Sequence, residues 1–298
     1  MMSSRQTFGR KQLVGSFNIG SLLEEKETSQ VWSGTEEKSG KRVVVKIIND
    51  KKAMKREAEV LLKLGGVYSP AVIDFGESLG RFYFAMEEFS RNVEEFLKLN
   101  DNHQFSCPNI IMILTQLFSA LEFCNKQGFM HGNISPLHVM LSKPNGSENY
   151  VLIKLVGFGK AQKLELVASK VVAVDVDIGD RDKKWTATGT LMSETLKPVD
   201  ELHQAMYLCW LMNNVDMHEF EKQDGGFEHK LNLTLNPLKT LPRALKWMAH
   251  VFCSLDPFDS DTIPDYAGLK KAATLCFRDY NRFEQLQLVE EEGILVLQ

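Results

Sequence analysis

The residues that could carry chemistry lie in three short segments of the chain. The apolar run RVVVKII contains Lys46 near its end, and Glu57 follows eleven residues later, where a carboxylate could pair with the lysine. The segment GFMHGNISPLHVML (128–141) has a histidine, a proline and a closing apolar run, and VGFGKA lies further along. A lysine held by a carboxylate on a neighbouring element could position and compensate an anionic group, and positioning and charge compensation are what a reaction such as phosphoryl transfer depends on.

The elements that must position these residues follow from the spacing of apolar side chains. β-Branched and aromatic runs separated by Gly, Ser and charged residues predict strands. Such runs lie at 12–23, 28–37 and 41–50, and two more lie within 69–89 around a turn at Ser78–Gly80. Residues 51–64 have an apolar stripe at helical spacing, so a helix is predicted there.

From about residue 92 the pattern becomes helical. Residues 109–128 predict a helix that Gly128 ends, and residues 149–159 predict a strand after the polar loop. Residues 200–212 are apolar almost all round, which predicts a buried helix, and the last third is mostly helical, at 241–255 and 265–277. Strands followed by helices imply an α+β chain in two lobes, with a joint near residues 87–92.

Three landmarks resemble those of the protein kinase family in order and spacing. Lys46 resembles the lysine of the V-A-I-K motif, and Glu57 resembles its partner on helix C. HGNISPLHVML overlays H-R-D-L-K-P-x-N-x-L, and GFGKAQ overlays D-F-G and the residues after it. The resemblance implies a bilobal α+β fold, with a small β-rich N-lobe that has one helix C and a larger, mainly helical C-lobe.

A finer resemblance is to the casein kinase 1 superfamily, particularly its tau-tubulin kinase-like branch. It rests on residues 56–97, on CSLDPFDSDTIPDY and on the TGT of 188–190. It extends from about Phe17 to Tyr280, with a poor match between Met192 and Pro242. The implied parts are an N-terminal extension (1–16), an N-lobe (17–88), a C-lobe (89–282) and a C-terminal tail (283–298).

The positions that carry catalytic charge in that family hold other residues here. Asn133 stands in place of the aspartate base, and a carboxamide is a poor proton acceptor near neutral pH. Ser135 replaces the loop lysine that faces phosphate. His138 and Gly157 replace the two magnesium ligands, although magnesium prefers oxygen ligands. Gly132 replaces the arginine of H-R-D. The resemblance thus implies a kinase fold without intact catalytic residues.

The phosphate-covering segment is altered as well. In IGSLLEEKETSQVW only Gly20 remains of the usual glycines, and the loop is expected to be a few residues longer. Three glutamates within 24–27 would repel ATP. Lys46 could bind ATP phosphates, or could pair with Glu57 only to fix helix C.

Other positions match the family in shape rather than charge. Met86 resembles the gatekeeper and Phe89 a hinge residue, beside a pocket that either admits adenine or is filled by side chains. His138 could ligate some other metal, but no partner ligand is evident in the sequence. The positions to which the resemblance gives architectural roles are His131, Phe158, Leu61 and Asp200.

Two features in the segment before Asp200 have alternative interpretations. The acidic residues of 175–182 are either a solvated loop or a surface for basic partner segments. Thr186, Thr188 and Thr190 are either phosphorylation sites or part of a structural turn.

Composition narrows the classes of function. A chain of 298 residues with 44% hydrophobic and 25% charged residues is typical of a soluble globular protein. A net charge of −4 argues against nucleic acids and anionic membranes as partners. Five widely spaced cysteines without a CxxC pair predict neither zinc nor disulfides. No signal-peptide core or membrane-length apolar run is found, so we expect a cytoplasmic location, or a nuclear one.

Three functions remain open from the sequence. The first is a catalytically inactive kinase-like protein that binds protein partners, such as active kinases or their substrates, and requires no cofactor. The second is a weak or unconventional ATP-binding serine/threonine kinase that keeps the Lys46–Glu57 pair. The third is a switch that binds ATP without a conventional magnesium site and without catalysis.

Overall fold

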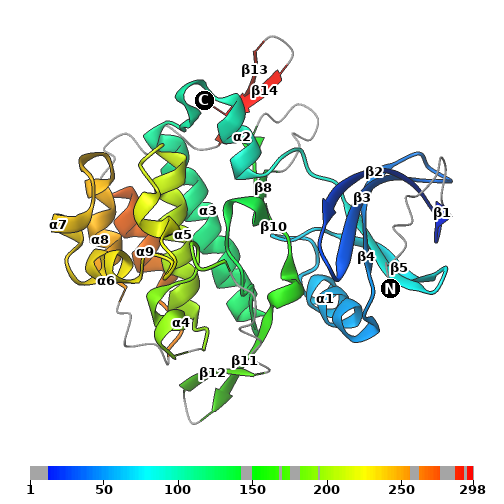
Figure 1. The fold of residues 1–298 in the computed structure, drawn as a ribbon, viewed down its shortest axis with the longest axis horizontal. Helices are drawn as coiled ribbons and strands as arrows, with labels where there is room; N and C mark the ends of the chain where they lie inside the picture. The colour runs from blue at the N-terminus through cyan, green and yellow to red at the C-terminus, as the bar shows by residue number, and fades with distance from the viewer. Residues whose placement is uncertain are drawn as a thin grey trace. The chain divides into compact units, whose positions relative to one another are not determined.

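A computed structural model describes residues 13–141, 150–167, 170–174, 182–193, 195–255, 262–275, 286–291 and 294–297. The chain divides into two compact units, Met1–Glu88 and Phe89–Gln298. The first unit is built on a β-sheet with one helix, and the second is mainly helical (Figure 1). The predicted α+β class is therefore confirmed.

The described part of the first unit contains one antiparallel sheet in the order β1-β2-β3-β4-β6-β5. The strands are β1 (Leu13–Val14), β2 (Phe17–Glu25), β3 (Ser29–Glu36), β4 (Arg42–Ile48), β5 (Val72–Ser78) and β6 (Arg81–Glu87). Phe17, Val43, Val45 and Ala85 belong to one buried cluster on this sheet. The buried residues of β4 alternate along the strand, as strand geometry requires.

Helix α1 (Lys51–Leu64) spans the residues that the sequence predicts for it. Asp50 caps its start, because the side chain accepts a hydrogen bond from the Lys52 backbone N–H at 2.8 Å. Gly65, with a φ of 62°, ends the helix in the left-handed conformation that glycine adopts without strain. The buried face of α1 packs on β4, β5 and β6.

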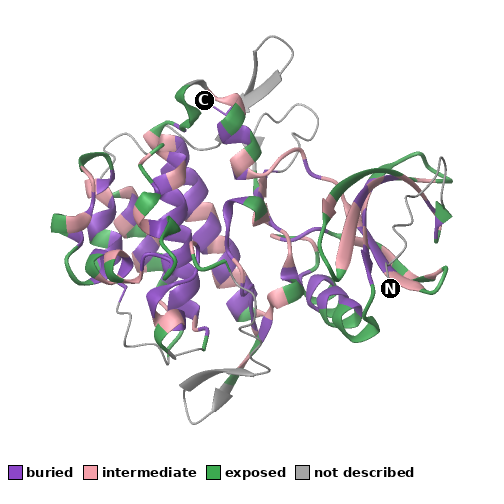
Figure 2. Ribbon diagram, viewed as in Figure 1, coloured by how far each residue is buried: buried purple, intermediate pink, exposed green. Residues whose placement is uncertain are grey.

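Helices α3 (Cys107–Lys126) and α5 (Pro198–Met212) form the core of the second unit, and Figure 2 shows both as largely buried. By length and composition, α3 is apolar enough to cross a membrane, which the sequence analysis did not anticipate. However, 67% of its most apolar window is buried inside the protein. Core helices of folded domains meet the same criteria, so this one helix is weak evidence for a membrane span.

Shorter helices complete the described part of the second unit. They are α2 (Val93–Leu99), η1 (Asp101–His103), α4 (Thr188–Ser193), η4 (His218–Glu221), α6 (Phe227–Leu235), α7 (Pro237–Thr240), η5 (Arg243–Met248), α8 (Ala249–Cys253) and α9 (Tyr266–Thr274). The helix predicted at 241–255 is thus divided, since its first part is the 3₁₀ helix η5. Leu245 and Met248 are both buried, which suits a helix with three residues per turn.

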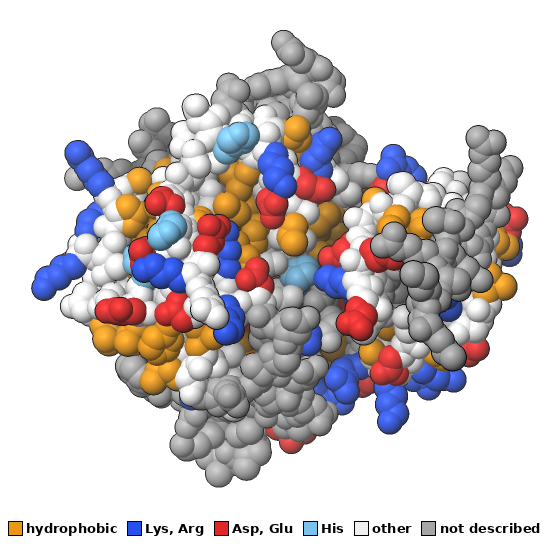
Figure 3. Space-filling model, in the orientation of Figure 1, with side chains coloured by type: hydrophobic (Ala, Val, Ile, Leu, Met, Phe, Trp, Pro, Cys, Tyr) orange, Lys and Arg blue, Asp and Glu red, His pale blue; other side chains and the backbone are white. Residues whose placement is uncertain are grey.

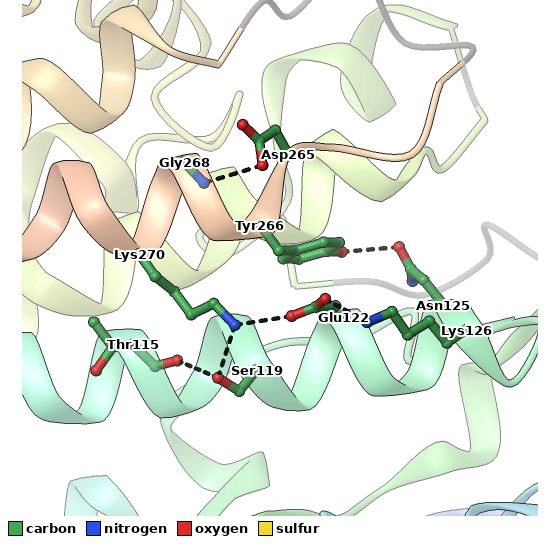
Figure 4. A network of polar contacts seen from close by, with 9 residues as sticks. All are labelled: Thr115, Ser119, Glu122, Asn125, Lys126, Asp265, Tyr266, Gly268 and Lys270. Atoms are coloured by element: carbon green, nitrogen blue, oxygen red, sulfur yellow. Dashed lines mark hydrogen bonds and ion pairs between the residues drawn. The ribbon is translucent and has the colours of Figure 1, made fainter.

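Polar contacts hold α9 against α3 (Figure 4). The Tyr266 hydroxyl donates to Asn125 Oδ1 at 2.8 Å, and Lys270 Nζ lies 2.8 Å from Glu122 Oε2. Hydrogen bonds from Lys126 and Lys270 lower the pKa of the Glu122 carboxyl. These contacts join the end of the described helical region to its central helix.

Short strands complete the described part of the second unit, and β7, β8 and β10 flank the loops that contain candidate site residues. They are β7 (Phe129–Met130), β8 (Val139–Leu141), β9 (Tyr150–Val151), β10 (Ile153–Leu155), β11 (Gln162–Val167), β12 (Lys170–Val174), β13 (Leu286–Glu291) and β14 (Ile294–Leu297), with the 3₁₀ helices η2 (Pro136–His138) and η3 (Phe158–Lys160). β8 pairs with β10, and β11 pairs with both β7 and β12. These pairings place the polar loop beside the residues that follow β10. The pairs β11–β12 and β13–β14 were not predicted from the sequence.

Candidate functional site

Lys46 and Glu57 form an ion pair within the first unit. Lys46 Nζ lies 2.8 Å from Glu57 Oε1 and 2.7 Å from Oε2, and the two side chains are 14% and 5% exposed. The lysine comes from β4 and the glutamate from α1, and the ammonium also lies 5.9 Å from the centroid of the Phe84 ring. Leu61, one turn after Glu57, is buried. The ion pair therefore fixes the position of α1 on the sheet.

Lys46→Met is expected to destabilise the protein by about 3 kcal/mol, because the nearly buried Glu57 carboxylate loses its partner. The double variant Lys46→Met/Glu57→Leu should recover most of that loss, since it also removes the unpaired charge. Urea unfolding of the three proteins measures both effects. Equal losses of stability in the single and double variants would show that the unpaired Glu57 carboxylate is not what destabilises Lys46→Met.

The β2–β3 hairpin corrects the expected long phosphate-covering loop. β2 continues to Glu25, and only residues 26–28 connect it to β3. Two register shifts between Ile19 and Glu24 accommodate the additional residues within the strand. The predicted loop is therefore mostly paired strand.

Gly20 lies in this hairpin beside two serines that bond across the strands. The Ser21 backbone N–H donates to Ser33 Oγ at 2.8 Å, and the two hydroxyl oxygens are 2.9 Å apart. A Cβ at Gly20 would lie 2.6 Å from Ser33 Oγ, so the absence of a side chain makes room for this contact. The Ser21 amide is thus used within the hairpin.

Met86 and Phe89, predicted to line an adenine pocket, belong to different units. Met86 is half-buried on β6, where it pairs with Val44 of β4. Phe89 is buried in the second unit, and Lys154 Nζ lies 6.0 Å from its ring centroid. Because the two residues lie in different units, an adenine pocket lined by both stays a prediction.

His131 is fully buried and links the polar loop to the end of β10. Its Nδ1 accepts a hydrogen bond from the Asn133 backbone N–H at 3.2 Å, so the proton is placed on Nε2, which donates to the Val156 carbonyl at 2.8 Å. The ring centroid lies 4.5 Å from that of Phe158. His131 and Phe158 therefore pack against each other inside the second unit.

Asn133, Ser135 and His138 lie close together in the loop. His138 Nδ1 is 2.8 Å from the Asn133 carbonyl oxygen and 3.1 Å from Ser135 Oγ. Because a carbonyl oxygen can only accept, Nδ1 carries a proton and donates to it. An amide, a hydroxyl and an imidazole thus occupy three of the positions where the family has charged residues or metal ligands.

Gly157 lies directly beside His138. It has a φ of 82° and a ψ of 41°, in the left-handed region. A Cβ built at this glycine would lie 2.6 Å from His138 Cδ2 and 2.7 Å from Nε2. The sequence shows that both residues depart from the family pattern, but not that the ring of one fills the space beside the other.

Two side chains of α5 hold the backbone of the loop. The Gly132 N–H donates to Glu201 Oε1 at 2.7 Å, and the Ile134 N–H donates to Gln204 Oε1 at 3.1 Å. Both α5 side chains are buried. Neither residue was predicted from the sequence, although polar residues three apart on a mostly apolar helix share one face, which was the available signal.

Asp200 is buried at the start of α5, where it caps that helix. Its Oδ2 accepts a hydrogen bond from the Lys197 backbone N–H at 2.9 Å. The carboxylate that binds the Gly132 amide of the polar loop is that of the next residue, Glu201. Asp200 therefore caps α5, and its neighbour Glu201 binds the polar loop.

The three threonines noted in the sequence lie at the start of α4: Thr186 just precedes the helix, and Thr188 and Thr190 belong to it. Thr186, Thr188 and Thr190 are all buried, and Thr186 Oγ1 donates to the Asp182 carbonyl at 2.9 Å. Phosphorylation would first require this segment to open. Residues 175–181 of the acidic run lie outside the described residues.

A buried lysine anchors this segment to α6. Lys230 Nζ donates to the carbonyl oxygens of Lys183 at 2.8 Å and Thr186 at 2.9 Å. It also lies 5.1 Å from the ring centroid of Tyr207 and 5.5 Å from that of Phe220. This lysine was not predicted from the sequence, because a lone lysine on a helix gives no pattern.

Comparison with known proteins agrees with this arrangement. The family model described as protein kinase domain matches residues 17–197, more than half of the chain. A probable serine/threonine-protein kinase dyrk2 of Dictyostelium discoideum is 27% identical over 164 residues, 51% of this chain and 17% of that protein. CBL-interacting serine/threonine-protein kinase 5 of Arabidopsis thaliana is 27% identical over 163 residues, 50% of this chain and 34% of that protein. The match thus spans about a third or less of these relatives' length. The chain belongs to the protein kinase domain family.

Magnesium, which that family uses, does not fit the residues at the expected ligand positions. Gly157 offers no side-chain atom, and His138 offers an imidazole where a hard cation prefers oxygen. Among the residues that the structure describes, no group of three or more His, Cys, Asp or Glu side chains could hold a metal ion.

Proposed function

We propose that this protein is a catalytically inactive member of the protein kinase family that acts by binding other proteins, as a scaffold or regulator. The observation that carries this proposal is the set Asn133, Ser135, His138 and Gly157, which stands in place of the base, the loop cation and both metal ligands. The loss of each such group costs orders of magnitude in rate, with effects that do not simply add.

As part of the same proposal, we assign the chain to the casein kinase 1 superfamily and its tau-tubulin kinase-like branch. The support is the sequence resemblance of residues 56–97 and 188–190. The partners proposed on this basis are active kinases or their protein substrates, in the cytoplasm or nucleus.

Exposed apolar side chains on the second unit support a protein-binding role. Met192 of α4, Leu235 of α6 and Leu238 of α7 are 58%, 55% and 67% exposed, and their helices adjoin one another. On the face drawn in Figure 3, basic and acidic side chains are interspersed, and hydrophobic side chains gather along the lower left edge. Apolar side chains grouped on a surface mark protein interaction sites more often than isolated ones.

Thermal unfolding with ATP, with ATP plus magnesium, and with neither tests the proposal. A ligand that binds only the folded state raises its stability. We expect magnesium to add nothing to any effect of millimolar ATP, and phosphate transfer to a general protein substrate to stay at the background rate. A stabilisation that requires magnesium, together with phosphate transfer, would contradict catalytic inactivity.

The intact Lys46–Glu57 pair favours a second candidate, a weak ATP-binding serine/threonine kinase. In kinases this lysine contacts the nucleotide phosphates while the glutamate holds it in place. The variant Lys46→Arg keeps the charge but changes its geometry. Under the second candidate, the wild type transfers phosphate and the Lys46→Arg variant does not. Under inactivity, both proteins give the same background.

A further inference from the structure

The imidazole of His138 is held in a defined orientation beside Gly157. Its Nδ1–H donates to the Asn133 carbonyl at 2.8 Å, with Ser135 Oγ at 3.1 Å. The His138 carbonyl accepts a hydrogen bond from the Val156 backbone N–H at 3.0 Å, directly next to the pairing of β8 with β10. The backbone of His138 is thus fixed, and rotation of its ring away from Gly157 would break the Nδ1 hydrogen bond.

The ring fills the space that a side chain at residue 157 would need. The Cβ of any such residue would approach the ring to 2.6–2.7 Å, closer than Cβ atoms are found. The backbone itself is a smaller obstacle, because aspartate and asparagine adopt positive φ more readily than other non-glycine residues. The obstacle to aspartate at residue 157 is therefore the imidazole.

We propose that His138 and Gly157 act as a coupled pair that closes the divalent-cation position of this kinase fold. The ring excludes the metal by occupying the space of its principal ligand, in addition to the loss of ligand atoms. This inference rests on the proposed function, since it assigns a mechanism to the loss of metal-dependent catalysis. A divalent cation should be regained only when both residues are changed together.

A double-mutant cycle tests the coupling. The wild type, Gly157→Asp, His138→Asn and the double variant are compared by urea unfolding and by Mn²⁺ binding, with Mn²⁺ as a paramagnetic probe. We expect Gly157→Asp to lower the folding equilibrium constant at least tenfold more in the wild-type background than in the His138→Asn background, because contacting residues are not additive. We expect the double variant to bind Mn²⁺ at least tenfold more tightly than either single variant.

A second cycle with alanine at each position repeats the test without new charge or ligand atoms, in case an aspartate variant does not fold. Gly128→Ala serves as its control, because Gly128 has a φ of 81° and a Cβ there would come no closer than 3.8 Å to the Leu164 carbonyl oxygen. Equal costs of the change at residue 157 in both backgrounds would overturn the coupling. Mn²⁺ binding by Gly157→Asp alone, or none by a folded double variant, would overturn the closure of the metal position. None of these outcomes affects catalytic inactivity of the natural chain, which phosphate transfer tests separately.

Discussion

Gly132→Ala is expected to destabilise the protein by about 3 kcal/mol, combining the cost of a left-handed backbone with that of overpacking. Gly132 has a φ of 84°, and a Cβ there would fall on the backbone carbonyl oxygen of Lys160. The Lys160 carbonyl is part of the backbone, so it cannot rotate out of the way as the end of a flexible side chain can. The η3 segment would have to move away from the polar loop. Urea unfolding monitored by tryptophan fluorescence gives the loss directly.

Gly128→Ala is the matched control for this prediction. The two glycines have nearly equal φ values, 81° and 84°, and lie four residues apart in the same loop region. Since a Cβ at Gly128 has room, its replacement should cost only the backbone term, about 1 kcal/mol. Similar losses in the two variants would show that the close approach of Lys160 makes no difference to stability.

The tight contact at Gly132 bears on the proposed inactivity. In the family this position holds an arginine, a common tie to a phosphorylated activation loop. Here the Lys160 backbone occupies the space that any side chain would enter, and Glu201 binds the Gly132 amide. An arginine at residue 132 therefore could not be accommodated unless the Lys160 backbone at the end of η3 moved away.

Local patterns were sufficient to predict most of the fold. The residues of α1 were correctly bounded, because a charged cap, an apolar stripe and a closing glycine coincide there. The β-branched runs and turns also predicted five strands in the first unit, and the structure divides the first of these runs into β1 and β2. The hairpins β11–β12 and β13–β14 were missed because their runs are short and pair with segments far apart in the chain. The division of 241–255 into η5 and α8 has no clear signal in side-chain spacing.

The sequence identified several residues of the candidate site, but among their contacts it anticipated only the Lys46–Glu57 pair. Motif spacing identified Lys46 and Glu57, and the structure pairs them. Spacing could not show that His138 fills the room beside Gly157, because that depends on the pairing of β8 with β10. The contacts from α5 were missed for the same reason: Glu201 reaches Gly132 across 69 positions of sequence.

Lys230→Met is expected to destabilise the protein by about 2 kcal/mol at pH 9, because the carbonyls of Lys183 and Thr186 lose their donor, and the second of these bonds is buried. Methionine matches the stem of lysine in length, so little packing is lost. The segment that leads into α4 should detach first, with faster amide hydrogen exchange there. Lys239→Met on α7 is the control, since Lys239 is exposed. Equal losses in the two variants would contradict an anchoring role.

The pH dependence of this loss separates anchoring by the amine from simple packing. Burial lowers the pKa of Lys230 to about 7 from its ordinary 10.5, against the opposing charges of Asp182 and Asp224. Between these values the unfolded chain binds the proton and the folded protein does not, so stability rises with pH from about 7 towards 10.5. The difference between wild type and Lys230→Met should therefore widen by about 1 to 2 kcal/mol from pH 7 to pH 9. A constant difference over that range would mean that the buried amine stays charged, held by the two carbonyls and the faces of Tyr207 and Phe220.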